Sequence, residues 1–67
     1  MYELRDTFND CTISRHHKLE RAIKAEMAVD KAMTNGSYLP TSIIDLDDGE
    51  PVERDYIEDL KSDIRHG

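Results

Sequence analysis

Residues 15–34 read RHHKLERAIKAEMAVDKAMT, and the spacing of their apolar residues predicts one long helix. The apolar face of this helix carries Leu19, Ala22, Ile23, Met27 and Met33. Ser14 precedes the stretch as a suitable N-cap. Asn35-Gly36 follows it, and glycine tolerates the left-handed conformation that closes a helix. The stretch therefore predicts a helix that buries one face against a second layer.

The segment before this helix has the pattern of a β-hairpin. Residues 2–8 alternate in polarity and place Tyr2, Leu4 and Phe8 on one side, which is typical of a half-buried strand. Asn9-Asp10 is a turn dipeptide. Residues 11–13 are then expected to return as a short second strand.

The segment after the long helix predicts a third strand and a second helix. Residues 37–47 supply side chains that suit an extended strand, and Asp47-Asp48-Gly49 indicates a turn. Pro51 suits the first turn of a helix that continues to about residue 64. The apolar stripe of that helix is expected to comprise Val52, Tyr56, Ile57, Leu60 and Ile64. Its opposite face carries Asp55, Glu58, Asp59, Ser62 and Asp63.

Together these elements predict an α+β fold. The expected order is β-β-α-β-α, in a small two-layer domain whose short antiparallel sheet packs on the long helix. A chain of 67 residues corresponds to one domain, which we expect to span residues 1–67. Such a domain buries only about 60% of the surface of its unfolded chain, which leaves little room for a dry active site.

The composition bounds the compartment. Cys11 is the single cysteine, so no internal disulfide can form. The N-terminal residues show no apolar run typical of a signal peptide. No stretch approaches the ~20 apolar residues that cross a membrane. We therefore expect a cytoplasmic protein that does not associate with membranes.

The net charge of −6 is distributed unevenly along the chain. Residues 1–39 contain six acids and six bases, whereas residues 40–67 contain nine acids and three bases. The whole charge imbalance therefore lies in the C-terminal part. A gathered excess of one sign is typical of a surface that attracts an oppositely charged partner, although it also keeps a small protein soluble.

A basic cluster at the expected start of the long helix is one candidate site. It consists of Arg15, His16, His17 and Lys18. Positive side chains oppose the helix dipole at an N-terminus, so their presence there invites a functional explanation. The helix amides with Arg15 and Lys18 could hold a phosphate or a carboxylate. The alternative is a solvated cluster with both histidines on the surface.

Metal binding and catalysis find little support in the sequence. Cys11 with His16, His17 or His66 lacks the paired spacings of a structural zinc site. A calcium loop that began at Asp45 would need glycine and glutamate where Glu50 and Tyr56 stand. The glycines form no phosphate-binding loop. We therefore expect no cofactor, no metal and no enzymatic activity.

The acidic C-terminal part is the preferred candidate for binding a partner. Its carboxylates could present an array comparable to the phosphates of a nucleic acid. Two tyrosines are the expected anchors, because tyrosine offers buried area with a polar tip. The candidate residues are Asp45, Asp47, Asp48, Glu50, Asp55, Glu58, Asp59, Asp63, Tyr38 and Tyr56.

In its profile the chain resembles the small acidic inhibitors encoded by phages and mobile elements, such as anti-CRISPR proteins. The resemblance lies in short length, high charge and the absence of a catalytic motif. It implies stoichiometric inhibition of a host nucleic-acid-processing complex through a basic surface of that complex, without direct binding of nucleic acid. No functional residue is carried over from the group.

Two alternatives remain open. One is a small nucleic-acid-binding or regulatory module that uses the basic cluster together with Arg21 and Lys24. The other is a toxin-neutralising or accessory subunit whose apolar face completes the core of another protein.

Overall fold

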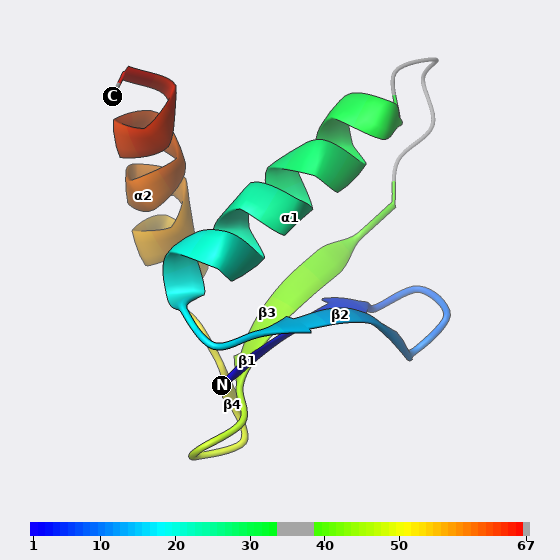
Figure 1. Ribbon diagram of the computed structural model, residues 1–67. Helices are drawn as coiled ribbons and strands as arrows, with labels where there is room; N and C mark the ends of the chain where they lie inside the picture. Colours follow the sequence, from blue (N-terminus) through cyan, green and yellow to red (C-terminus); the bar gives the residue numbers. More distant parts are fainter. Residues whose placement is uncertain (34–38, 67) are drawn as a thin grey trace.

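The computed structural model describes residues 1–33 and 39–66. In these residues the chain forms four strands and two helices in the order β-β-α-β-β-α (Figure 1). They are β1 (Tyr2–Asp6), β2 (Cys11–His16), α1 (Leu19–Ala32), β3 (Thr41–Asp45), β4 (Glu50–Pro51) and α2 (Arg54–His66). The predicted α+β class and antiparallel sheet are confirmed, and β4 is an additional short strand.

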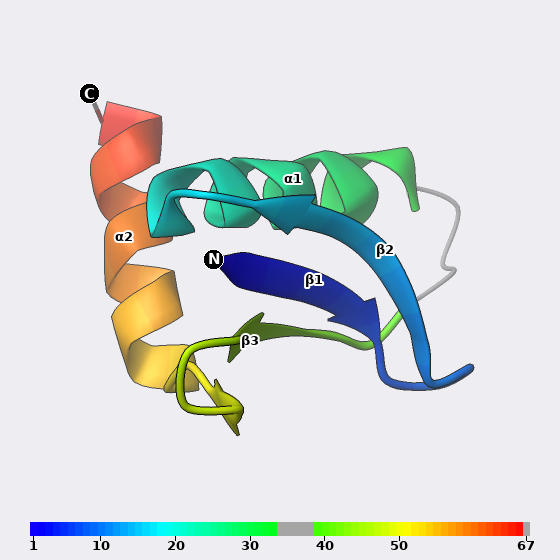
Figure 2. The ribbon, with the colours of Figure 1, turned by 60° about the horizontal axis from the view of Figure 1, so that its bottom comes forward.

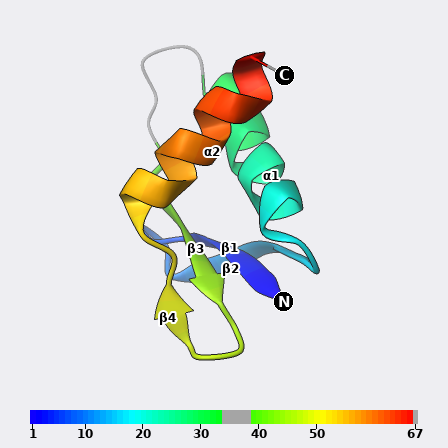
Figure 3. The same cartoon turned by 90° about the vertical axis from the view of Figure 1, so that its left-hand side faces the viewer.

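The sheet has the order β2-β1-β3-β4, and all its neighbouring strands are antiparallel. The central strand β1 places Leu4 opposite Ser14 of β2 and Ile43 of β3. Because α1 connects β2 to β3 on either side of β1, the chain crosses over β1 through this helix (Figure 2). Figure 3 shows both helices on one side of the sheet, which gives two layers.

The core draws one fully buried large aliphatic side chain from each of β1, α1, β3 and α2, and none from β2. Leu4 of β1, Ile23 of α1, Ile43 of β3 and Ile57 of α2 are all inaccessible to solvent. Ala22 is also fully buried, and its small side chain allows close approach of the neighbouring layer. The predicted core face of the long helix is therefore confirmed for Ala22 and Ile23.

The predicted start of the long helix is wrong. The helix begins at Leu19, with Lys18 as its N-cap, and Arg15 and His16 extend β2 instead. Ser14 is not a cap, since it pairs opposite Leu4 in the sheet. The ladder with β1 satisfies the backbone of these residues, and tertiary pairing of this kind overrides the local capping signal.

The end of the long helix differs less from the prediction. Its last residue is Ala32, and the Met33 N–H donates to the Val29 carbonyl at 3.1 Å. Met33 is exposed because it lies beyond the helix, so its expected place on the apolar face is wrong. The predicted stop at Asn35-Gly36 lies outside the described residues.

The predicted turn at Asn9-Asp10 is confirmed, but Phe8 is not on the core side. The strand ends at Asp6, and Phe8 is 78% exposed in the turn. The buried Asp6 carboxylate accepts hydrogen bonds from the Phe8 N–H at 2.9 Å and the Asn9 N–H at 3.1 Å. An aspartate that binds the backbone two and three residues on ends the extended pattern before Phe8.

The predicted turn at Asp47-Asp48-Gly49 is confirmed, whereas Pro51 does not begin a helix. Gly49 has φ +73°, and its N–H donates to the Asp45 carbonyl at 2.8 Å. Pro51 lies in β4, where it pairs with Ile44, and the Val52 N–H donates to the Ile43 carbonyl at 2.8 Å. Pro51 suits this edge strand because proline has no N–H to donate. The second helix therefore starts only at Arg54.

Candidate partner-binding surface

Tyr56 and the acids of the β3–β4 hairpin line one hollow, which we call the Tyr56 hollow. Its volume is about 250 Å³. The lining residues are Tyr2, Leu19, Asp45, Asp48, Glu50, Pro51, Val52 and Tyr56. The tight turn at Gly49 brings the hairpin acids beside the first turn of α2, which carries Tyr56. The hairpin acids and Tyr56, which lie on different elements, are therefore neighbours at this hollow.

The sequence predicted Tyr56 to be part of the buried stripe of α2, and this prediction is wrong. Its side chain is 53% exposed, while Ile57 beside it is fully buried. Val52 does pack against the core, but from the segment before α2 and not from the helix. A half-exposed tyrosine in a hollow keeps apolar area and a hydroxyl available for contact with a partner.

Asp48 and Glu50 are exposed at this hollow, whereas Asp45 is half-buried. The Asp45 carboxylate accepts the Asp47 N–H at 3.0 Å, which shapes the turn. Asp47 lies 3.9 Å from the N-terminal ammonium and is 88% exposed. Among the described residues, Asp45, Asp48 and Glu50 have no ion-pair partner. Their negative charges are therefore uncompensated at the rim of the hollow.

The outer side of α2 carries a second set of acids. Asp55, Asp59 and Asp63 recur every four residues, so they form one row along the helix, and all three are exposed. In the described part of the chain none of them forms an ion pair. The predicted acidic face is confirmed as an exposed row at these positions.

Glu58 is different from the other acids of α2. Its carboxylate lies 3.7 Å from Arg54 and 3.6 Å from Lys61, so it belongs to an ion network. Its charge is partly compensated within the protein. The predicted place of Glu58 on the acidic face is confirmed, since it is 52% exposed, but its charge is not free as that of Asp55 is.

The centre of this ion network is a buried pair that the sequence analysis missed. The carboxylate of Glu26 on α1 is 2.7 Å from the Lys61 ammonium and 2.6 Å from the Arg54 guanidinium. The Thr41 hydroxyl donates to the same carboxylate at 2.9 Å. Glu26 and Lys61 are 1% and 4% exposed. A signal for their burial was available, because each lies one helical turn from a core isoleucine, Ile23 and Ile57 respectively.

Both members of the pair are held in their charged forms. Burial opposes ionisation of Glu26, but hydrogen bonds from Arg54, Lys61 and Thr41 outweigh it and lower the pKa of this carboxyl. Burial likewise opposes the charge of Lys61, but the carboxylates of Glu26 and Asp30 outweigh it and raise the pKa of the ammonium. The network therefore joins α2 to α1 and leaves the outer acids of α2 free for other contacts.

The basic residues are only partly gathered at the start of α1, where the sequence predicted them. Arg15 lies in β2, and its Nε is 3.3 Å from the Glu3 carboxylate. A separate hollow of about 330 Å³ is lined by His16, Lys18, Glu20, Arg21 and Lys24. Glu20 lies 3.1 Å from Lys24 and compensates part of that positive charge. The structure thus brings His16 and Lys18 of the basic cluster together with Arg21 and Lys24, and Arg15 does not line this hollow.

Tyr38, the other expected anchor, lies outside the described residues. Cys11 and His16 occupy opposite ends of β2, which places their backbones roughly 16 Å apart in an extended strand. Across residues 1–33 and 39–66, no three His, Cys, Asp or Glu side chains come close enough to share a metal ion. No helix among the described residues is long and apolar enough to cross a membrane.

Comparison with known proteins gives no relative, since no family model, curated protein or solved structure matches the chain.

Proposed function

We propose that this protein is a non-catalytic inhibitor that binds a basic surface of a nucleic-acid-processing protein. Its acidic C-terminal part would occupy the place of the nucleic acid, in the manner of anti-CRISPR-type inhibitors. The supporting observation is the Tyr56 hollow, in which a half-exposed tyrosine stands among the uncompensated carboxylates of Asp45, Asp48 and Glu50.

The proposed mechanism gives both sets of acids one task and the hairpin acids a second. The row Asp55, Asp59 and Asp63 attracts the basic partner together with the hairpin acids, and both sets raise the association rate. Tyr56 then provides contact area, because rim charges alone add little affinity. A lysine or arginine of the partner can lie on the Tyr56 ring while the hairpin carboxylates accept its hydrogen bonds. Nucleic acid is excluded because its phosphates would need the same basic side chains.

A displacement experiment tests this proposal. The immobilised protein is used to capture its partner from a lysate of the source organism, and the partner is identified by mass spectrometry. The partner is then loaded with fluorescent DNA or RNA and titrated with this protein. We expect full release of the nucleic acid at one equivalent. A partner that holds nucleic acid and this protein at the same time would contradict the proposal, as would a captured toxin without nucleic-acid function.

The hollow lined by His16, Lys18, Arg21 and Lys24 favours a second candidate function, direct binding of nucleic acid or of another phosphate-bearing ligand. The net charge of −6 opposes it. Fluorescence anisotropy with labelled DNA and RNA separates the two functions. The inhibitor proposal predicts only non-specific affinity, with a Kd of about 10⁻⁴–10⁻⁶ M. Submicromolar binding that is lost in Lys18→Ala/Arg21→Ala would favour the second function.

A further inference from the structure

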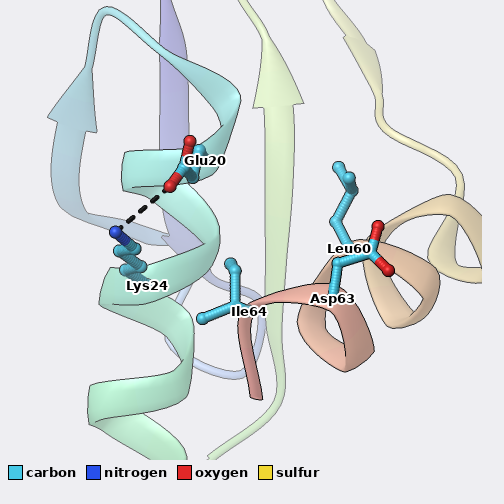
Figure 4. A pocket seen from close by; sticks show the side chains of 5 residues that line it. All are labelled: Glu20, Lys24, Leu60, Asp63 and Ile64. Atoms are coloured by element: carbon cyan, nitrogen blue, oxygen red, sulfur yellow. Dashed lines mark ion pairs between the residues drawn. The ribbon is translucent and has the colours of Figure 1, made fainter. Parts of the chain in front are cut away.

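Another hollow lies between the two helices, and we call it the helix groove. Its volume is about 450 Å³. Leu60 and Ile64 of α2 face Glu20 and Lys24 of α1 across it, and Asp63 stands beside them (Figure 4). Leu60 and Ile64 are only half-buried, although both pack against the core. They therefore offer an apolar floor that the protein itself does not cover completely.

The helix groove and the Tyr56 hollow are neighbours along α2. Leu60 follows Tyr56 by one helical turn on α2, and Glu20 follows Leu19 directly on α1. Because residues four apart lie on the same side of a helix, Tyr56 and Leu60 place the two hollows one turn apart on α2. We call the two neighbouring hollows together the seam. A segment of a partner that lies along the seam would contact the hairpin acids at one end and the apolar floor about one helical turn away.

The charge around the two hollows is negative. Asp45, Asp48, Glu50 and Asp63 have no ion-pair partner among the described residues, and Lys24 is already paired with Glu20 at 3.1 Å. Two copies of this chain would bring acidic rims together, each on a molecule of net charge −6. The complementary occupant is therefore a positively charged segment and not a second copy.

We infer that the seam binds an amphipathic, basic segment of the partner protein. One apolar side chain of that segment lies on Leu60 and Ile64, and basic side chains about one helical turn away reach Tyr56 and the hairpin acids. This inference rests on the proposed function and specifies the partner's chemistry. Nucleic-acid-binding surfaces of lysine and arginine alone would fill the Tyr56 hollow but leave the apolar floor empty.

Synthetic peptides of about 15 residues test the inference. The probe is an amphipathic helical peptide of leucine and lysine. One control replaces every leucine with serine, and the other replaces every lysine with glutamate. Each is titrated into isotope-labelled protein, and binding is followed by NMR through the methyl groups of Leu60 and Ile64 and the amides of Tyr56 and Glu50. We expect the leucine–lysine peptide to shift the NMR signals of all four residues. The affinity of the serine peptide should be lower by a factor of about ten or more, and the glutamate peptide should not bind.

The outcomes separate this inference from the proposed function. A serine peptide that binds as tightly as the probe and shifts only Tyr56 and Glu50 would overturn the apolar docking site and leave the acidic inhibitor proposal standing. A probe that causes no shift at either hollow would contradict both.

A matched pair of variants adds a test that leaves the core intact. Asp63 lines the helix groove, whereas Asp59 is one turn away on the same helix and does not. Both are exposed and lack an ion-pair partner among the described residues. Asp63→Lys should weaken binding of the leucine–lysine peptide about fivefold more than Asp59→Lys. Equal effects of the two variants would show that binding depends only on the overall negative charge of α2. That result would overturn the placement of the peptide in the helix groove.

Discussion

The ammonium of Lys61 on α2 lies 2.7 Å from the carboxylate of Glu26 on α1, and both side chains are almost completely buried. This pair lies at the junction of the two helices whose outer surfaces carry the proposed binding site. An ion pair in this position stabilises the fold only while it is complete, because a single remaining buried charge is costly. The relative placement of α1 and α2, and with it the helix groove, therefore depends on two residues that do not contact the partner.

Removal of one member of this pair should destabilise the protein strongly. We expect Lys61→Ala to lower the free energy of unfolding by about 3 kcal/mol, since the buried Glu26 carboxylate loses a donor that Arg54 replaces only in part. The control is Lys24→Ala, which breaks the exposed pair with Glu20 and should cost only about 0.3–0.5 kcal/mol. Urea denaturation followed by circular dichroism measures both. Equal losses in the two variants would contradict a stabilising role for the buried pair.

The protein should lose stability in acid. Hydrogen bonds from Thr12, Arg5 and Arg15 lower the pKa of Glu3. Hydrogen bonds from Arg54, Lys61 and Thr41 outweigh burial and lower the pKa of Glu26. A carboxyl with a lowered folded-state pKa contributes stability that is complete above the unfolded value of 4.5 and is lost as the pH falls through the folded value. The urea midpoint should therefore be constant near neutral pH and fall steadily below about pH 4.5. Glu26→Gln should make this decline shallower, and an unchanged slope in that variant would exclude Glu26 as a contributor.

A charge at the centre of the core should unfold the protein. Ile23 is fully buried, so Ile23→Asp would bury an unpaired carboxylate and should abolish the cooperative melt in circular dichroism. Ile13 is also an isoleucine, but it lies on β2 and is 39% exposed. Ile13→Asp is the control and should retain a cooperative melt. An unchanged melt for Ile23→Asp would refute the assignment of α1 to the core.

The fold was predictable to the extent that local periodicity and turn chemistry decide it. The core positions Leu4, Ile23 and Ile57 follow from patterns within single elements, and so does the turn that ends at Gly49. The errors occurred where a long-range contact overrides the local signal. Ser14 has the chemistry of a helix cap, but the sheet pairs it with Leu4. Pro51 has the chemistry of a helix start, but β3 pairs it with Ile44.

The candidate site was predictable in part. Composition indicates an acidic C-terminal region, and the structure leaves most of these acids exposed. Composition cannot tell a free acid from a compensated one. Glu58 and Asp59 look alike in the sequence, but among the described residues only Glu58 lies close to Arg54 and Lys61. Nor could it reveal that Tyr56 lies beside Asp48, since that proximity arises from the fold of the β3–β4 hairpin.

The distinction between free and compensated acids decides which variants test the role of the acidic surface. Reversal of Glu58 would set a lysine beside Arg54 and Lys61, and reversal of Glu26 would bury a like-charge cluster, so neither isolates binding. Asp48→Asn/Glu50→Gln removes two free charges at the Tyr56 hollow. Asp10→Asn/Asp30→Asn removes two charges that are paired with Arg5 and Lys61 and lie outside both hollows. The two double variants carry the same net charge, so a difference between them reports the position of the charge.

The most direct measurement is the association rate of these two double variants with the captured nucleic-acid-processing partner, followed by surface plasmon resonance at low and high salt. If the acidic C-terminal surface occupies the basic surface of the partner, Asp48→Asn/Glu50→Gln slows association several-fold at about 0.05 M salt, and the difference from wild type shrinks at about 0.5 M as the charges are screened. Asp10→Asn/Asp30→Asn should remain close to wild type under both conditions. Equal association rates for the two double variants at low salt, with both folds intact, would contradict the proposal and restrict the acidic surface to a role in solubility.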